Sequence, residues 1–169
     1  MMRIAEPVLA EFKLEAKTTR RMLERLPPER LAWKPHAKSM SLGRLAMHLA
    51  GIPGWARVIL DQDELVLTGP TPTPEPGSVA EVLDAFDRHA ASFGELLGAQ
   101  DNARMLAKWR MRAGDRVVVE APRAAMIRSA VLSHIVHHRG QLSVYLRLLD
   151  VPLPPVYGPS ADESGLGNL

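Results

Sequence analysis

The sequence predicts an all-α protein, a four-helix bundle that carries a small β-hairpin between its third and fourth long helices. Apolar residues recur at spacings of three and four along long stretches, prolines and glycines fall between those stretches, and 169 residues fit one domain. The composition, 46% hydrophobic and 24% charged, is that of an ordinary globular protein. We therefore expect residues 1–169 to form a single domain, with residues 151–169 as a Pro- and Gly-rich C-terminal tail.

Two amphipathic stretches form the first half of the expected bundle. The first runs from Pro7 to Leu26 and ends at Pro27–Pro28, because a residue before proline avoids helical geometry. The second begins after Ser41, whose side-chain oxygen can cap a helix, and it contains His48. Pro53–Gly54 interrupts an apolar pattern that continues beyond it, so we expect a kink or a short break there.

A proline-rich connector precedes the third helix. Residues 67–77 have a proline at every second position from Pro70 to Pro76, which predicts an extended, polyproline-like segment on the surface. Ser78 and Glu81 then have the spacing of a capping box, and the helix that follows should end near Gly98.

The remaining sequence predicts a hairpin and a fourth helix. Between residues 107 and 120, apolar residues alternate with polar or small ones around residues 113–115, which is typical of a short β-hairpin. The apolar spacing then predicts a helix from about Arg123 to Leu149, which Pro152 terminates.

Composition argues against several classes of protein. The chain has 21 Lys and Arg and 19 Asp and Glu, so its formal charge is only +2. The pI of 9.2 therefore reflects a small excess of basic residues and does not indicate a nucleic-acid-binding surface. No stretch reaches the roughly 18 apolar residues that cross a bilayer, and no secretory leader is recognisable, so we expect a cytoplasmic protein without membrane or nucleic-acid partners. The absence of cysteine excludes disulfides, a thiolate nucleophile and Cys-based zinc motifs.

Three histidines lie on apolar helix faces. His134 and His138 are four residues apart, so both imidazoles project from one face of the last helix, and His48 has the same setting on the second helix. Each histidine alone is more simply interpreted as a core residue with one hydrogen bond. Together, three buried neutral imidazoles would leave unmet hydrogen bonds at roughly 1 to 3 kcal/mol per group, whereas one shared metal ion satisfies a nitrogen of each. Three imidazole ligands also leave a coordination position open for water or substrate, as in catalytic sites.

The other histidines and the neighbours of this group have more ordinary interpretations. We expect His36 and His89, which lie among polar or loop residues, to be exposed to solvent. His137 falls on a face of small residues that suits the approach of another helix, which could come from a second subunit. Three flanking residues could orient a substrate or a ligated imidazole; they are Arg139, Gln141 and Tyr145. Surface solvation or core packing explains them equally well.

Motifs along most of the chain match a known family in combination. They are His134-Ile-Val-His-His138-Arg-Gly-Gln141, Tyr145-Leu-Arg-Leu-Leu149 and Pro152 through Ser160, and, nearer the N-terminus, Trp33-Lys-Pro35, Ser41-Leu-Gly43 and His48-Leu49 with Trp55. These segments resemble the DinB family, also called DinB/YfiT-like. The resemblance implies a four-helix bundle, often a homodimer, with a three-histidine site that binds nickel or zinc. Carried over by position, the ligands would be His48, His134 and His138, which agrees with the argument from helix faces.

The family that the sequence resembles has no single activity. Related proteins include S-transferases and isomerases that use low-molecular-weight thiols, and others are known as damage-inducible proteins. The leading hypothesis is a divalent-metal-dependent enzyme whose ion activates water or a small-molecule thiol, since the chain has no cysteine of its own. The alternative is a non-catalytic, metal-binding stress-response bundle that acts through stability or partner binding.

Overall fold

The computed structural model describes residues 2–69 and 72–165 of the chain. Its helical segments are α1 (Ala5–Leu23), the 3₁₀ turn η1 (Pro28–Arg30), α2 (Leu42–Gly51), the 3₁₀ turn η2 (Ile52–Gly54), α3 (Trp55–Asp61), α4 (Val79–Gly98), α5 (Asn102–Leu106), α6 (Arg123–Ile127), the π-helical segment η3 (Arg128–Ser133) and α7 (His134–Leu148). Its strands are β1 (Glu64–Leu67), β2 (Lys108–Ala113) and β3 (Arg116–Pro122).

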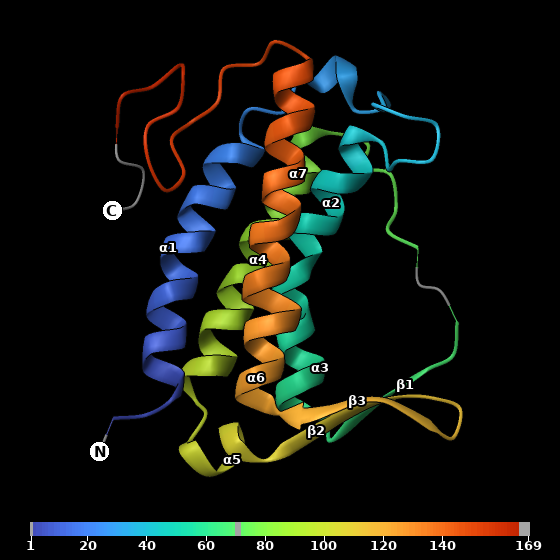
Figure 1. Ribbon diagram of the computed structural model, residues 1–169, viewed down its shortest axis with the longest axis vertical. Helices are drawn as coiled ribbons and strands as arrows, with labels where there is room; N and C mark the ends of the chain where they lie inside the picture. The colour runs from blue at the N-terminus through green and yellow to red at the C-terminus, as the bar shows by residue number, and fades with distance from the viewer. Residues whose placement is uncertain (1, 70–71, 166–169) are drawn as a thin grey trace.

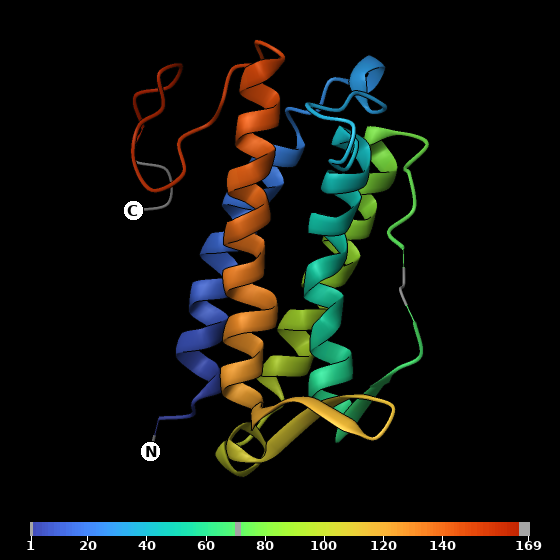
Figure 2. The same ribbon diagram turned by 45° about the vertical axis from the view of Figure 1, so that its right-hand side comes forward.

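The long helices lie side by side, and the sheet closes one end of the array (Figures 1 and 2). The apolar faces that the sequence predicts turn inward, where the rings of Phe12 on α1 and Phe93 on α4 lie 4.0 Å apart between centroids. Leu49 of α2 and Leu142 of α7 are also fully buried. This packing places α2 beside α7, which brings together the two helices that carry the histidines.

Two of the long helical columns change geometry partway along their length. Pro53 produces the expected break, because α2 and α3 are separated by the 3₁₀ turn Ile52–Gly54. The helix expected from Arg123 to Leu149 is continuous but contains a π-helical segment, Arg128–Ser133, directly before His134. Such wider turns occur often at functional sites, because they change the direction in which the following side chains project.

The sheet is larger than the expected hairpin. Strands β2 and β3 pair antiparallel around a turn at Gly114, whose φ of +58° suits glycine. Strand β1 adds to the other side of β2 in parallel, so the sheet is mixed, with the order β1-β2-β3. The architecture is therefore mostly helical with a three-stranded mixed sheet, and the expectation of four helices with a lone hairpin is corrected. Neither β1 nor α5 was expected, since both are too short to show a period.

A buried arginine ties the sheet to the helices. Arg123, only 1% exposed, donates hydrogen bonds to the carbonyls of Ile59, Gln62 and Lys108 and to the carboxylate of Asp63 at 2.6 Å. The bonds to Ile59 and Gln62 satisfy carbonyls at the end of α3, where no further helical turn follows. The end of α3 is thereby fixed against the start of α6.

The connector and the tail both pack along the helices. The described parts of the connector, residues 67–69 and 72–77, lie on the outer side of α3 and α2 and lead to the start of α4 (Figures 1 and 2). Ser78 caps α4 as expected by accepting from the backbone N–H of Glu81. Pro70 lies outside the described residues. The tail is held through Glu163, which pairs with Arg21 and Arg25 of the N-terminal helix and its end.

Within residues 2–69 and 72–165, no helix combines the length and the apolar character needed to span a membrane.

Candidate metal site

Three imidazoles from two helices converge at one point. His48 lies on α2, and His134 and His138 lie one turn apart at the start of α7. The Nε2 atom of His134 is 3.3 Å from Nε2 of His48 and 2.9 Å from Nε2 of His138. The ligand atoms of all three rings lie within 4.8 Å of one another. Among the described His, Asp and Glu side chains, these three histidines are the group close enough together to hold a metal ion.

The outward side of each ring is already occupied by a hydrogen bond. Nδ1 of His138 lies 2.7 Å from the amide oxygen of Gln141, which can only accept, so this nitrogen carries the proton. His134 is hydrogen-bonded to the backbone of Ala130, one turn earlier, and Nδ1 of His48 lies 3.2 Å from the hydroxyl of Thr73. The acceptors bonded to His138 and His134 require a protonated Nδ1, and the hydroxyl of Thr73 allows the same tautomer in His48. In that tautomer the lone pairs of the Nε2 atoms face one another.

The surroundings keep these rings uncharged. The pKa of His138 is lowered to about 4, mainly by burial; its bond to Gln141 opposes this effect, and the nearby rings of His48, His134 and His137 contribute to the lowering. Burial is also the main cause of the lowered pKa of His48 and His134; His48 is further affected by His134 and then by the cation Arg44. Neutral imidazole is the form that binds a metal ion, so the site is ready for one at neutral pH.

The donor set fits a divalent cation. Three unprotonated nitrogens at this separation repel one another unless a positive charge lies between them. Ligand nitrogens about 2.0–2.1 Å from an ion are about 2.9 Å apart at right angles and about 3.3 Å apart at tetrahedral angles. The two measured Nε2–Nε2 distances, 2.9 and 3.3 Å, match these values.

The flanking residues have three different roles. Gln141 bonds directly to His138, as described above. Tyr145 donates to the carbonyl of Met40 at 3.4 Å and packs edge-on against Trp33, so it joins the loop before α2 to α7. Arg139 points away from His138 and toward α1, where its guanidinium pairs with Glu15 at 2.6 Å.

Of the two histidines expected to be exposed, His36 is and His89 is not. His137 is also exposed, and its approach by another helix stays a prediction. His89 is half-buried, not exposed, because its Nδ1 lies 3.0 Å from the carbonyl of Ala50 across the α2–α4 contact. The expectation for His89 is wrong, since tertiary packing turns this polar position of α4 toward α2.

Sequence reasoning missed Thr73 and Arg44. Thr73 lies between two prolines of the connector, and only the path of that connector brings it to His48. Arg44 lies one turn before His48 on α2, and its buried Nε has no hydrogen-bond partner in the described part of the chain. The spacing of four residues was the available signal for Arg44.

Comparisons with known proteins identify the family and support the fold. A model of the DinB family matches residues 1–165. The uncharacterized protein YrdA of Bacillus subtilis is 25% identical over 164 residues, which are 96% of this chain and 93% of YrdA. A crystal structure of a DinB-like protein from Bacillus cereus has a TM-score of 0.72 at 24% identity, covering 90% of this chain and 97% of that one. For the DinB-like protein YjoA of Bacillus subtilis the TM-score is 0.66 at 17% identity, over 88% and 95% of the two chains. The chain belongs to the DinB family.

Proposed function

We propose that this protein is a divalent-metal-dependent enzyme in which His48, His134 and His138 hold one ion. The observation that carries the proposal is the convergence of three neutral imidazoles whose outer sides are bonded elsewhere and whose Nε2 atoms lie 2.9 and 3.3 Å apart. Three imidazoles suit zinc or nickel and leave a coordination position for a reactant, as in catalytic zinc sites. A cation held in this way lowers the pKa of a water molecule or a thiol that reaches it, which supplies a nucleophile near neutral pH.

The chain's own residues prepare the site for this chemistry. Gln141 fixes the tautomer and orientation of the His138 ring through a hydrogen bond of 2.7 Å, and the hydroxyl of Thr73 orients the His48 ring at 3.2 Å. A cavity of about 360 Å³ opens beside His48 and gives a small molecule access to it. Because the chain has no cysteine, a thiol used here must be a small-molecule reactant.

Metal content and turnover test the proposal together. We expect about one zinc or nickel per chain in the wild type, loss of that metal in His134→Ala, and retention in the control His137→Ala, whose ring is exposed. Turnover of electrophiles with several thiols, or hydrolysis of activated esters, should follow metal content across the three proteins.

Two results would contradict the enzyme proposal. Metal-free wild type after gentle purification would remove its basis. Bound metal without turnover, with a melting temperature that falls on chelation, would instead support a non-catalytic, metal-stabilised bundle.

A further inference from the structure

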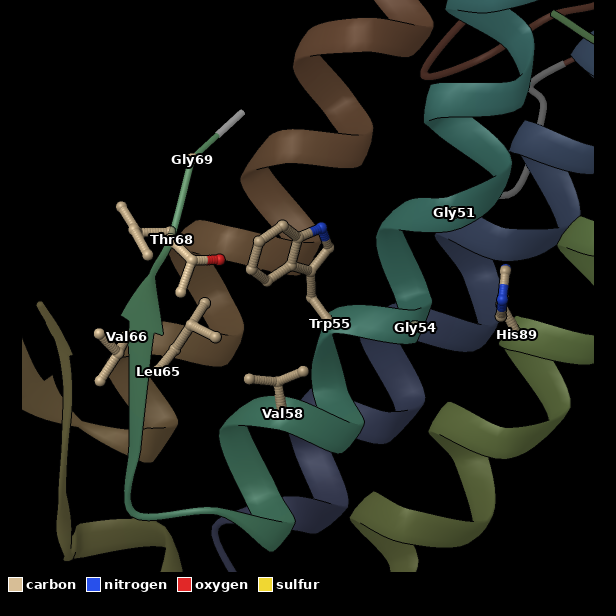
Figure 3. A pocket seen from close by; sticks show the side chains of 10 residues that line it. Gly51, Gly54, Trp55, Val58, Leu65, Val66, Thr68, Gly69 and His89 are labelled. Carbon is tan, nitrogen blue, oxygen red and sulfur yellow. The ribbon is translucent and has the colours of Figure 1, made fainter. Parts of the chain in front are cut away.

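Two adjoining cavities form a groove over α2 and α3 beside the histidine site. One, of about 420 Å³, lies between α3 and β1 (Figure 3). The other, of about 360 Å³, reaches His48. Both are lined by Gly51, Trp55 and His89, so they share a wall, and the second cavity is also lined by the candidate metal ligand.

Glycines keep the groove open. Gly51 has φ −81° and ψ −19°, a conformation that any residue adopts, so the backbone does not require glycine there. A Cβ at Gly51 would contact no atom within 4 Å, which shows that the missing side chain leaves free space above the helix. A Cβ at Gly54 would lie 3.2 Å from Cδ2 and 3.5 Å from Nε2 of His89, so this glycine allows the ring edge of His89 to lie against the helix.

The wall of the groove is apolar and uncharged. In Figure 3 the side chains of Trp55 and Val58 point from α3 toward the strand side, where Leu65 and Thr68 lie. No Asp, Glu, Lys or Arg is among the described residues that line either cavity; the apolar members are Met47, Trp55, Val58, Leu65, Val66, Leu67, Pro72 and Pro74. An ionic ligand would lose its hydration without gaining a charged partner among these lining side chains, whereas a flat apolar ligand would bury surface against the indole of Trp55.

His89 supplies a directional polar group. Its Nδ1 donates to the carbonyl of Ala50 at 3.0 Å, so in the neutral ring Nε2 is an acceptor. Nε2 has no hydrogen-bond partner within the described ranges, and the ring lines both cavities. A ligand with one O–H or N–H donor on its apolar body would satisfy this nitrogen.

We propose that the groove binds the substrate, and that the substrate is an uncharged molecule with a flat apolar body and one hydrogen-bond donor for His89. The body lies over Gly51 against Trp55, and its reacting end extends toward His48. The assignment of a reacting end rests on the proposed enzymatic function; the recognition of the apolar body does not.

Binding of three naphthalene probes to the purified protein, measured by isothermal titration calorimetry, tests this assignment. 2-Naphthol carries one donor, 2-methoxynaphthalene carries none, and naphthalene-2-sulfonate is anionic. We expect 2-naphthol to bind several-fold more tightly than the methoxy compound, because one neutral hydrogen bond is worth roughly a factor of 2 to 12. In protein freed of metal with a chelator, so that no cation lies at the His48 end of the groove, the sulfonate should bind about tenfold more weakly or not at all.

Two variants locate the binding. Gly51→Leu places a side chain in the open space, where its Cβ meets no atom within 4 Å, and should weaken 2-naphthol at least about tenfold. Ala80→Leu, at an exposed position of α4 outside both cavities, should bind it like the wild type. His89→Phe should remove the preference for 2-naphthol over the methoxy compound. Absence of 2-naphthol binding, equal binding of the sulfonate, or unchanged binding in Gly51→Leu would overturn the proposal.

Metal content is recorded for every sample, so the two proposals fail separately. Metal-free protein whose 2-naphthol binding is lost in Gly51→Leu would retain the groove and reject the metal enzyme. Metal-loaded protein that binds none of the three probes would reject the groove as a binding site and leave the metal-enzyme proposal standing.

Discussion

Replacing Arg139 by methionine should strongly destabilise the protein while leaving its metal content unchanged. Arg139 is 2% exposed and pairs with Glu15, which is itself 12% exposed, at 2.6 Å. Its guanidinium also donates to the backbone carbonyl of Glu15, to the hydroxyl of Thr19 and, at 2.7 Å, to the hydroxyl of Tyr157 in the tail. Removing it leaves a carboxylate desolvated and without its cation.

The size of the effect follows from this burial. Breaking a buried ion pair by removing one partner costs roughly 3–5 kcal/mol, because the remaining charge stays buried. For a chain of this length, 1 kcal/mol shifts the melting temperature by about 2–4 °C, so Arg139→Met should melt roughly 6–20 °C below the wild type.

Urea denaturation followed by circular dichroism measures this difference, and elemental analysis measures the metal. The matched control is Arg128→Met, because Arg128 is 59% exposed and pairs with the exposed Glu11; its loss should cost about 1 kcal/mol or less. An Arg139→Met protein as stable as this control, or one that keeps its stability but loses its metal, would refute the structural role of Arg139.

Three further changes have outcomes that the contacts specify. Gln141→Leu removes the acceptor of a ligand imidazole and should weaken metal affinity about 10- to 100-fold in a chelator competition; unchanged affinity would contradict that role. Hydrogen bonds from Arg104 and Arg123 lower the pKa of Asp63 below its ordinary 3.8, so this ionised carboxylate stabilises the fold above that pH and the contribution is lost as the pH falls through the lowered value. Acid titration of unfolding should therefore show a shallower loss of stability below about pH 4 in Asp63→Asn than in the wild type, and equal slopes would count against the pairing. Ser78→Ala removes the cap of α4 and should cost about 1 kcal/mol in urea denaturation; no change would show that the bond to Glu81 contributes nothing.

Local patterns were sufficient for most of the helices. The caps at Ser41 and Ser78 and the break at Pro53 depend on a few neighbouring residues, and each occurs as expected. The turn at Gly114 is equally local. Strand β1 is different, because four residues without a clear period become a strand only by pairing with β2, more than 40 positions later.

The candidate site divides in the same way. Helical periodicity brought His134 and His138 to one face and indicated that His48 faces them. The same geometry explains why Arg139 turns elsewhere, since adjacent residues on a helix project about 100° apart. Thr73 and His89 reach the site or the groove through the connector and the α2–α4 contact, which no spacing in the sequence encodes.

The most direct test of the metal site is X-ray absorption at the metal edge of the purified protein. We predict a divalent ion with three imidazole ligands, a count that falls on replacing His48 by alanine and is unchanged in His137→Ala. A spectrum without imidazole scattering, or three imidazoles still bound in the His48 variant, would contradict the assignment of these histidines to one ion.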